Sequence, residues 1–381
     1  MYYNIVCIST HSKSGCTSGA WHISSSAIIN RTHSGTATAM DNSTTVCCSF
    51  SAPMLDVALP PVLFTEFIVG LMGNFLALWM FIFQKQNWKP NSLYLTHLAV
   101  ADSVVLFCLP FRADYYRRGK DWIYGDVPCR ILLFMLAANR AAGIFFLTAI
   151  TVDRYLKIVH PINRVNRMGL SYAMWVSCGL WMLILAMTVY LLTEQHFYYH
   201  NNRTQCESFN ICMGFTPLNT WHNVFYVVQF FFPTMIVVYC TIRITLQLNN
   251  KTVDTQGKIR RAVYLVMTVA VIFIMCFFPS TISRIAVWIL KTMYSECSYF
   301  QEANLAFYTS VCFTYFNSVL NPVVYYFSSP EFSGILQNHH LGRLPALASL
   351  YYLLFSLKPC ELVTYKEGEH WCVDNGKENP N

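Results

Sequence analysis

Seven long apolar stretches constrain the fold of this chain more than any other feature. A helix needs about 20 apolar residues to cross the hydrocarbon core of a membrane, and each stretch is long enough. Hydrophobic residues make up 55% and charged residues 12% of the 381-residue chain; a soluble domain usually has about twice that charged fraction. The sequence therefore predicts an all-α membrane protein, a bundle of seven transmembrane helices at Val57–Phe83, Ser92–Phe111, Pro128–Val159, Tyr172–Leu192, Trp221–Leu248, Ala262–Leu290 and Ala303–Phe327.

Loop charge predicts on which side of the membrane the N-terminus lies. Lys and Arg gather in the loops after the first, third and fifth stretches, and this positive-inside bias places the N-terminus outside. Three glycosylation sequons, at Asn30, Asn42 and Asn202, then fall on the outer side. We expect an extracellular arm over residues 1–56, the helical domain over 57–327 and a cytoplasmic tail with a short amphipathic helix over 328–381. The apolar residues 341–357 of that tail fit an interfacial segment or a mis-spliced gene model.

A single charged residue interrupts the third stretch. Arg140 lies in the run Ile131–Ile150, which holds no other charge. A guanidinium keeps its proton there, and placing it at the centre of a transmembrane helix costs roughly 2.5–3.5 kcal/mol. Such a charge persists when it pairs with an acid inside the bundle or binds an anionic ligand. The acids at membrane depth are Glu66, Asp102 and, at the rim, Glu302, and we favour a ligand carboxylate over an internal pair.

Three further residues are candidates for the same anion site. Arg140 follows Cys129, at the outer end of its helix, by 11 residues, which is about 16 Å at ~1.5 Å per residue. Arg284 lies nearer the outer end of the sixth stretch, and Tyr315 lies on the seventh. A guanidinium matches a carboxylate with two hydrogen bonds, to which Tyr315 can add a third. Arg112, at the end of the second stretch, is either a ligand residue or an Arg that snorkels to the interface.

Polar and proline motifs recur in a fixed order along the seven stretches. They are Gly73-Asn74, Leu98-Ala-Val-Ala-Asp102, Asp153-Arg154-Tyr155, Pro233, Cys276-Phe277-Phe-Pro279 and Asn321-Pro322-Val-Val-Tyr325. Each fragment alone is a weak signal. Together, in this order on seven spans, they make the chain resemble the rhodopsin-like class of G-protein-coupled receptors.

The class resemblance implies a switch at the inner end of the bundle. It implies that Asp153, Arg154 and Tyr155 face a G protein and that the neighbouring acid holds Arg154 at rest. Prolines kink helices, and a kinked bundle can have two packings of similar energy. The residues expected to carry this switch are Pro279, Phe277 (where the class usually has Trp), Asn321, Pro322 and Tyr325.

Asp102 is a carboxylate near the midplane of the membrane, so it needs partners. Oxygen ligands suit a hard cation. The class resemblance implies that this cation is an allosteric sodium ion, and no other cofactor is expected. Gly143 stands where most members have Ser or Thr, and a dry or water-filled polar network is the alternative. The residues expected around the sodium ion are Asp102, Asn139, Asn317, Ser318 and Asn321.

Longer stretches resemble one family within this class, the hydroxycarboxylic acid receptors, together with the related oxo-eicosanoid branch. They include Leu136-Ala-Ala-Asn-Arg140, Cys108-Leu-Pro-Phe111, Lys157-Ile-Val-His-Pro161 and Phe313-Thr-Tyr315-Phe-Asn317-Ser. The resemblance covers roughly residues 47–332. It implies that Arg140 binds the carboxylate of the ligand and that Arg284, Phe307, Tyr315 and Ser208 surround it. Lys120 and Tyr115 depart from the niacin-binding member, whereas Cys206-Glu-Ser-Phe209 looks more like the lactate-recognising member.

The family resemblance also implies three outer disulfides. Cys129 and Cys206 are expected to join. The adjacent Cys47 and Cys48 are expected to reach Cys212 and Cys297. Six cysteines alone allow 15 pairings, so this connectivity comes from the family.

The sequence thus predicts a multi-pass plasma-membrane receptor. An enzyme is not expected, because the chain has no HExxH, G-x-S-x-G or metal-binding CxxC motif. The expected partners are a small, lactate-like hydroxycarboxylic acid, membrane lipid and a heterotrimeric G protein, inhibitory by family resemblance; no nucleic acid is expected. The alternative within the class is a receptor for oxidised long-chain fatty acids. A carboxylate transporter is the alternative from another class, but no inverted repeat is visible.

Overall fold

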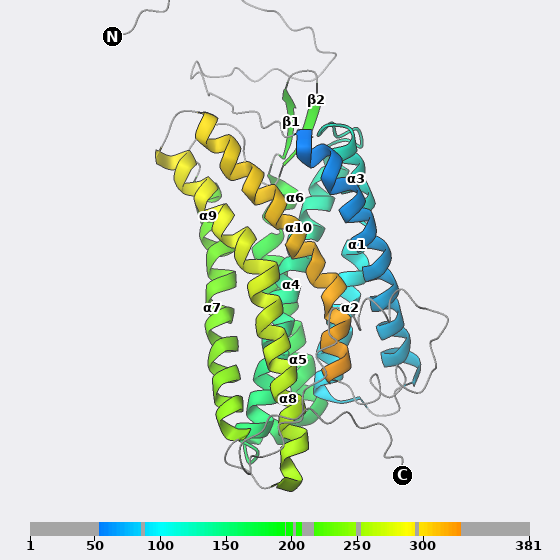
Figure 1. Ribbon diagram of the computed structural model, residues 1–381, viewed down its shortest axis with the longest axis vertical. Coiled ribbons are helices and arrows are strands. Elements are labelled where there is room, and N and C mark those ends of the chain that lie inside the picture. The colour runs from blue at the N-terminus through cyan, green and yellow to red at the C-terminus, as the bar shows by residue number, and fades with distance from the viewer. Residues whose placement is uncertain are drawn as a thin grey trace, which may run out of the picture. The chain divides into compact units, whose positions relative to one another are not determined.

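Helices make up most of the chain that the structure describes (Figure 1). It is a computed structural model that describes residues 53–84, 88–194, 196–200, 203–207, 217–248, 253–293 and 297–328. Six helical segments in these ranges are long and apolar enough to cross a membrane, and they confirm the first six predicted spans within a few residues. They are Pro53–Phe83, Pro90–Arg117, Asp126–Val159, Gly169–Thr193, Trp221–Gln247 and Ile259–Leu290.

Several of these spans are built from more than one helix. The first is α1 (Pro53–Trp79) with a π-helical end (Met80–Gln84), and the second is α2 (Pro90–Leu106) with α3 (Leu109–Arg117). The third is α4 (Asp126–Val159) alone, the fourth is α5 (Arg164–Thr188) with α6 (Tyr190–Thr193), and the fifth lies in α7 (Pro217–Leu248). The sixth joins α8 (Val253–Ile272), a π-helical turn (Phe273–Phe277) and α9 (Phe278–Met293).

The seventh predicted span lies in α10 (Cys297–Ser328), which has the length of a span but is less apolar than the other six. Its buried face carries a row of polar residues, which lowers the apolar content of the helix. They are Asn304, Ser310, Thr314, Asn317, Ser318 and Asn321. Polar groups at membrane depth are expensive and mark functional positions, so this helix is the first place to look for a site.

The helix α4 lies at the centre of the bundle. It packs against α2, α5, α7 and α8. In an apolar stretch of 18 residues of α4, 72% of the residues are buried, compared with 22% in the corresponding stretch of the fourth span, which contains α5. The exposed side chains of α5 are large and apolar, for example Trp175 and Met182, as expected of a surface that faces lipid. We call the two ends of the bundle the Cys129 end and the Asp153 end, after the residues of α4 that mark them.

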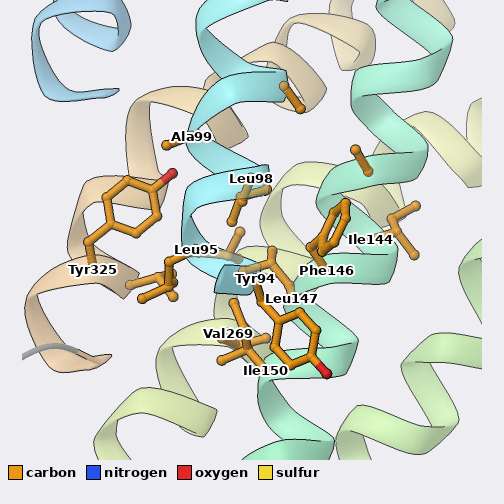
Figure 2. Packing of buried hydrophobic residues seen from close by; sticks show 14 of the residues in the cluster. Tyr94, Leu95, Leu98, Ala99, Ile144, Phe146, Leu147, Ile150, Val269 and Tyr325 are labelled. Carbon is orange, nitrogen blue, oxygen red and sulfur yellow. The ribbon is translucent and has the colours of Figure 1, made fainter. Parts of the chain in front are cut away.

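Two buried apolar clusters hold the helices together. The first brings together Leu95 of α2, Ile144 and Phe146 of α4, Val269 of α8 and Tyr325 of α10 (Figure 2). The second is rich in aromatic residues and contains Cys129 and Cys206. Its aromatic members are Tyr115, Tyr116, Trp122, Phe307, Tyr308 and Tyr315. The polar side chains considered below are therefore fixed by packing on most sides.

Proline shapes the sixth span as the sequence predicts. The π-helical turn Phe273–Phe277 ends just before Pro279, whose ring removes a backbone donor and crowds the preceding turn. The helix α10 runs through Pro322 from Cys297 to Ser328 without a change of helix type.

A short hairpin was not predicted. Strands β1 (Phe197–His200) and β2 (Arg203–Cys206) pair antiparallel, with Phe197 opposite Cys206. A disulfide joins Cys206 to Cys129, which confirms that predicted pair and ties β2 to the start of α4. The other two predicted disulfides depend on Cys47, Cys48 and Cys212, which lie outside the described residues.

Candidate functional site

Arg140 lies in the middle of α4 and is 4% exposed. Its Nη1 donates to Ser280 Oγ at 2.7 Å and to Thr314 Oγ1 at 3.3 Å, and its Nη2 donates to Thr281 Oγ1 at 2.7 Å. Across the described ranges, no carboxylate forms an ion pair with this guanidinium. The candidate acids Glu66 and Asp102 are therefore not its partners. Neutral hydroxyls hold both Nη atoms, while the buried Nε has no hydrogen-bond partner among the described residues.

These three hydroxyls are oriented by the π-helical turn. Ser280 and Thr281 donate to the carbonyl oxygen of Phe277 at 3.1 and 2.7 Å, and Thr314 donates to that of Cys276 at 3.2 Å. Because Ser280 and Thr281 donate their protons to the backbone, their lone pairs are available to Arg140. Thr314 Oγ1 can donate either to Cys276 or to Ser280 Oγ, which lies 3.0 Å away, and still accepts from Arg140. The guanidinium thus joins α4 to α9 and α10.

Tyr226 of α7 connects the two predicted anchor arginines. Its ring centroid lies 4.2 Å from Cζ of Arg140 and 5.4 Å from Cζ of Arg284. Arg284 is 5% exposed and donates through Nε to Asn223 Oδ1 at 3.0 Å, and the ring of Phe307 lies 5.6 Å from its Cζ. The structure thus brings Arg140, Arg284 and Phe307 together. Two guanidinium groups beside one ring favour an anion. Sequence reasoning did not single out Tyr226 or the three hydroxyls.

The remaining predicted ligand residues lie differently. Tyr315 is buried in the aromatic cluster, and in the described part of the chain it makes no hydrogen bond to Arg140. Arg112 is also buried, but it donates to the carbonyl oxygen of Cys206 at 3.1 Å and to the hydroxyl of Tyr116 at 3.2 Å. It therefore binds the hairpin rather than snorkelling to the interface. Ser208 lies outside the described residues.

A buried carboxylate at the Cys129 end was missed by the sequence reasoning. Glu207 is 2% exposed, accepts hydrogen bonds from the hydroxyls of Tyr115, at 2.9 Å, and Tyr308, and lies 3.8 Å from Nζ of Lys120. Burial lowers the pKa of Lys120 to about 8, an effect that Glu207 opposes. The signal available in the sequence was an acid directly after a disulfide cysteine. We call Glu207, Lys120, Arg112, Tyr115 and Tyr308 the Glu207 cluster.

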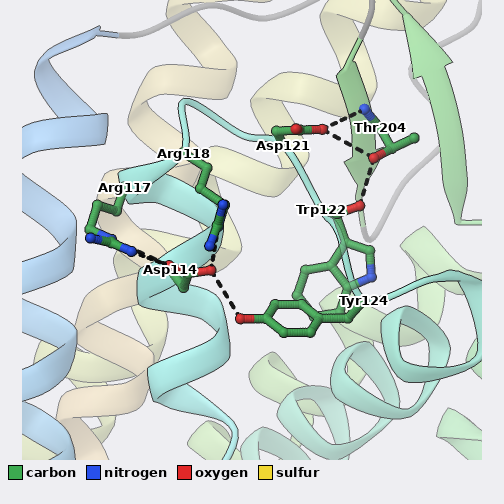
Figure 3. Close-up of polar contacts among 7 residues, drawn as sticks. All are labelled: Asp114, Arg117, Arg118, Asp121, Trp122, Tyr124 and Thr204. Atoms are coloured by element: carbon green, nitrogen blue, oxygen red, sulfur yellow. Dashed lines mark hydrogen bonds and ion pairs between the residues drawn. The ribbon is translucent and has the colours of Figure 1, made fainter.

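Hydrogen bonds fasten the loop after α3 to strand β2 of the hairpin (Figure 3). Asp121 accepts from the backbone nitrogen of Thr204 at 2.9 Å, and the Thr204 hydroxyl donates to the carbonyl oxygen of Trp122 at 2.6 Å. Lys120, in the same loop, has a φ of 62°, a conformation that non-glycine residues rarely adopt. The backbone around Lys120 is therefore determined by its surroundings.

Asp102 lies in a polar network between α2, α4 and α10. Its oxygens accept from Asn139 Nδ2 at 2.9 Å, Ser318 Oγ at 2.8 Å and Asn321 Nδ2 at 2.6 Å. The buried Oδ1 atoms of Asn317 and Asn321 have no hydrogen-bond partner among the residues that the structure describes. One carboxylate and unpartnered amide oxygens fit a sodium ion. The expected residues thus lie together, with Asn317 in the space beside Gly143, 2.9 Å from where a Cβ would be.

The expected pairing of Arg154 with its neighbouring acid is not found. Asp153 pairs instead with Lys157, 2.8 Å away and one turn further on, because residues four apart share a helix face whereas adjacent residues diverge. The Nε of Arg154 is buried without a hydrogen-bond partner in the described structure. The hydroxyl of Tyr155 lies 3.0 Å from His160 Nε2.

The other switch residues are buried between helices. Phe277 is fully buried, with its ring centroid 5.5 Å from Cζ of Arg140. Tyr325, near the C-terminal end of α10, donates to Asn74 Oδ1 of α1 at 3.0 Å.

The chain is similar to known receptors along most of its length. The family described as "7 transmembrane receptor (rhodopsin family)" matches residues 73–325. Human hydroxycarboxylic acid receptor 3 is 43% identical, covering 75% of this chain and 73% of the relative, and human hydroxycarboxylic acid receptor 1 is 40% identical, covering 75% and 81%. Human oxoeicosanoid receptor 1 is 34% identical, covering 75% and 73%.

Proposed function

Because the chain belongs to the hydroxycarboxylic acid receptors of the rhodopsin family, we propose that a small carboxylate bound at Arg140 activates it and that it signals through an inhibitory G protein. Family membership establishes a multi-pass plasma-membrane receptor, not an enzyme, with a ligand and a heterotrimeric G protein as partners. It also disfavours the transporter alternative.

The observation that carries the proposal is the partner set of Arg140. Three hydroxyls on α9 and α10 hold its two Nη atoms, and no described carboxylate pairs with it. A guanidinium and a carboxylate attract each other as opposite charges and can form two parallel hydrogen bonds, which separate neutral hydroxyls do not offer. A ligand carboxylate therefore competes favourably for the fork of Arg140, and Arg284 adds a second cation beside the same Tyr226 ring.

The same exchange links binding to signalling. When a ligand oxygen replaces a hydroxyl of Ser280, Thr281 or Thr314, one bond between α4 and α9 or α10 is lost. Because α9 follows the π-helical turn before Pro279, it can change its packing without breaking a regular helix. Ligand binding then shifts the population toward the packing that a G protein recognises.

Sodium belongs to the same proposal. Asp102 and the unpartnered Oδ1 atoms of Asn317 and Asn321 would hold the ion. A bound cation would balance the buried negative charge of Asp102.

The proposal is tested by inhibition of cyclic AMP formation in cells that express the chain. The ligand panel holds short hydroxy acids, including lactate, and oxidised long-chain fatty acids. We expect short hydroxy acids to inhibit cyclic AMP formation. We also expect guanine nucleotides to weaken the binding of these acids to membranes that contain the receptor. A response to long-chain acids alone would instead make the chain a receptor of the oxo-eicosanoid type.

A further inference from the structure

Arg261 joins α8 to the C-terminal end of α10. Its Nε donates to the carbonyl oxygen of Phe327 at 2.9 Å, and its Nη2 donates to that of Tyr326 at 3.0 Å. The two helices pack against each other (Figure 1). One half-buried side chain of α8 thus holds two backbone groups of α10 at the Asp153 end of the bundle.

The last turn of α10 needs such a donor, because the last carbonyl groups of a helix have no N–H partner within the helix. The residue four positions after Tyr326 is Pro330, which has no backbone N–H and disfavours helical backbone at the residue before it. A cation is also favourable at the C-terminal, negative end of a helix dipole. Arg261 therefore supplies hydrogen-bond donors, and a charge, that the backbone of α10 lacks.

The C-terminal end of α10 is anchored by contacts that do not involve α8. Tyr325 donates to Asn74 Oδ1 of α1 at 3.0 Å, and Asn91 of α2 donates to the hydroxyl of Ser328. All four of these side chains are buried. The helix α8, by contrast, is separated from α9 by the π-helical turn before Pro279, a place at which a helix can bend. At the Asp153 end, α10 is therefore the fixed helix and α8 is the one that can move.

An ion pair between α4 and α8 does not restrain this movement. Asp153 pairs with Lys157 of its own helix, and the buried Nε of Arg154 has no hydrogen-bond partner among the described residues. Across the described ranges, no ion pair joins α4 to α8. The hydrogen bonds of Arg261 therefore supply a polar restraint on α8 that no such ion pair provides.

We propose that Arg261 is a resting latch, which holds α8 against α10 and must release the last carbonyl groups of α10 before a G protein can bind at the Asp153 end. Release breaks two hydrogen bonds from a charged donor, and water restores only part of that free energy. A net loss equal to one ordinary hydrogen bond changes an equilibrium about fivefold. The latch needs a G-protein partner but no particular ligand, so it goes beyond the proposed function.

The experiment measures guanine-nucleotide exchange without added carboxylate. Washed membranes that carry the receptor are mixed with purified heterotrimeric G proteins of the inhibitory and stimulatory classes, and uptake of a labelled GTP analogue is followed. The variants are Arg261→Gln, Arg261→Lys and, as the matched control, Arg260→Gln. Arg260 is the neighbouring arginine of α8, and its Nε donates to the hydroxyl of Tyr264 in the same helix at 3.2 Å. The amount of receptor in the membranes is measured for every variant.

We expect Arg261→Gln to raise basal exchange per receptor about fivefold. Arg261→Lys should raise it less, because an ammonium group keeps the charge but not the fork, and Arg260→Gln should match the wild type.

Basal exchange in Arg261→Gln at or below that of the wild type would overturn the latch, as would an equal rise in Arg260→Gln. If Arg261→Gln does not reach the membrane, an Arg261→Lys variant with the basal exchange of the wild type would overturn it. A raised basal level in Arg261→Gln, in a receptor that responds to no carboxylate, would support the latch and overturn the proposed function instead.

Discussion

At the scale of the residue, Arg140 is held by groups that a ligand can replace. A buried charge loses its hydration and must recover that energy from the protein. Hydrogen bonds to neutral hydroxyls recover part of it, and a carboxylate recovers more. The protein can thus fold with the site empty of ligand, and a ligand with one negative charge still lowers the free energy when it binds at Arg140.

Gly143 can be tested through the space beside it. A Cβ at this position would lie 2.9 Å from Asn317 Nδ2 and 3.2 Å from Phe277 Cζ, whereas a Cβ at Gly179 of α5 would have no neighbour within 4 Å. We expect Gly143→Ala to destabilise the protein by about 1–3 kcal/mol through overpacking. Gly179→Ala should leave stability unchanged or raise it by up to about 1 kcal/mol through helix propensity. Thermal unfolding in detergent measures both, and a higher melting temperature for Gly143→Ala would contradict the packing.

Lys120 predicts a pH dependence of stability. Burial lowers its pKa in the folded protein to about 8 from the ordinary 10.5, while Glu207 and Asp56 raise it and Arg112 lowers it. Between these two values the folded chain holds a neutral amine and the unfolded chain a charged one, so unfolding binds a proton. The contribution of Lys120 to the free energy of unfolding therefore rises as the pH rises from about 8 to 10.5, and it is lost as the pH falls through 8. Unfolding curves from pH 7.5 to 9.5 should show wild type gaining stability relative to Lys120→Met. A difference independent of pH would refute the assignment.

At the scale of the element, the contact between α4 and α9 is the proposed resting restraint. Ser280→Ala with Thr281→Val removes two of the three hydroxyls around Arg140. We expect higher signalling without ligand, seen as lower cyclic AMP at matched surface expression. Thr309→Val is the control, because this exposed hydroxyl donates only within its own helix. Equal basal signalling in both variants would count against the restraint.

Helices and single charges were easier to predict from the sequence than contacts between helices. The apolar runs gave the six spans within a few residues because length and composition alone decide whether a helix can cross a membrane. Arg140 stood out because it is the one charge in its run. Tyr315 was expected beside it from its depth and from the family resemblance, neither of which specifies where a side chain points.

The missed features depend on long-range geometry. Glu207 is an ordinary acid in the sequence, and only the hairpin, the disulfide and α10 make it buried. The pairing of Asp153 with Lys157, by contrast, follows from a spacing of four residues on one helix. It could have been predicted without the structure.

At the scale of the whole molecule, the N-terminus is expected outside the cell. The positive-inside bias and the sequons at Asn30, Asn42 and Asn202 support this orientation; these residues lie outside the described ranges. An N-terminal epitope tag should bind antibody on intact cells, and a glycosidase should reduce the mass of the wild type. The variant with all three Asn replaced by Gln should show no such reduction. A tag that is accessible only after permeabilisation would reverse the orientation.

The measurement that tests the central claim most directly is the response of Arg140 variants to a carboxylate ligand. Cyclic AMP inhibition and ligand binding are compared for wild type, Arg140→Ala and Arg140→Lys at equal surface expression. Truncating one partner of a buried charge pair costs about 2–5 kcal/mol, so Arg140→Ala should lose at least about 30-fold in potency and in affinity. Arg140→Lys should lose less, because it keeps the charge but not the two-pronged fork. An Arg140→Ala receptor that binds and signals like the wild type would show that the arginine is structural and contradict the account.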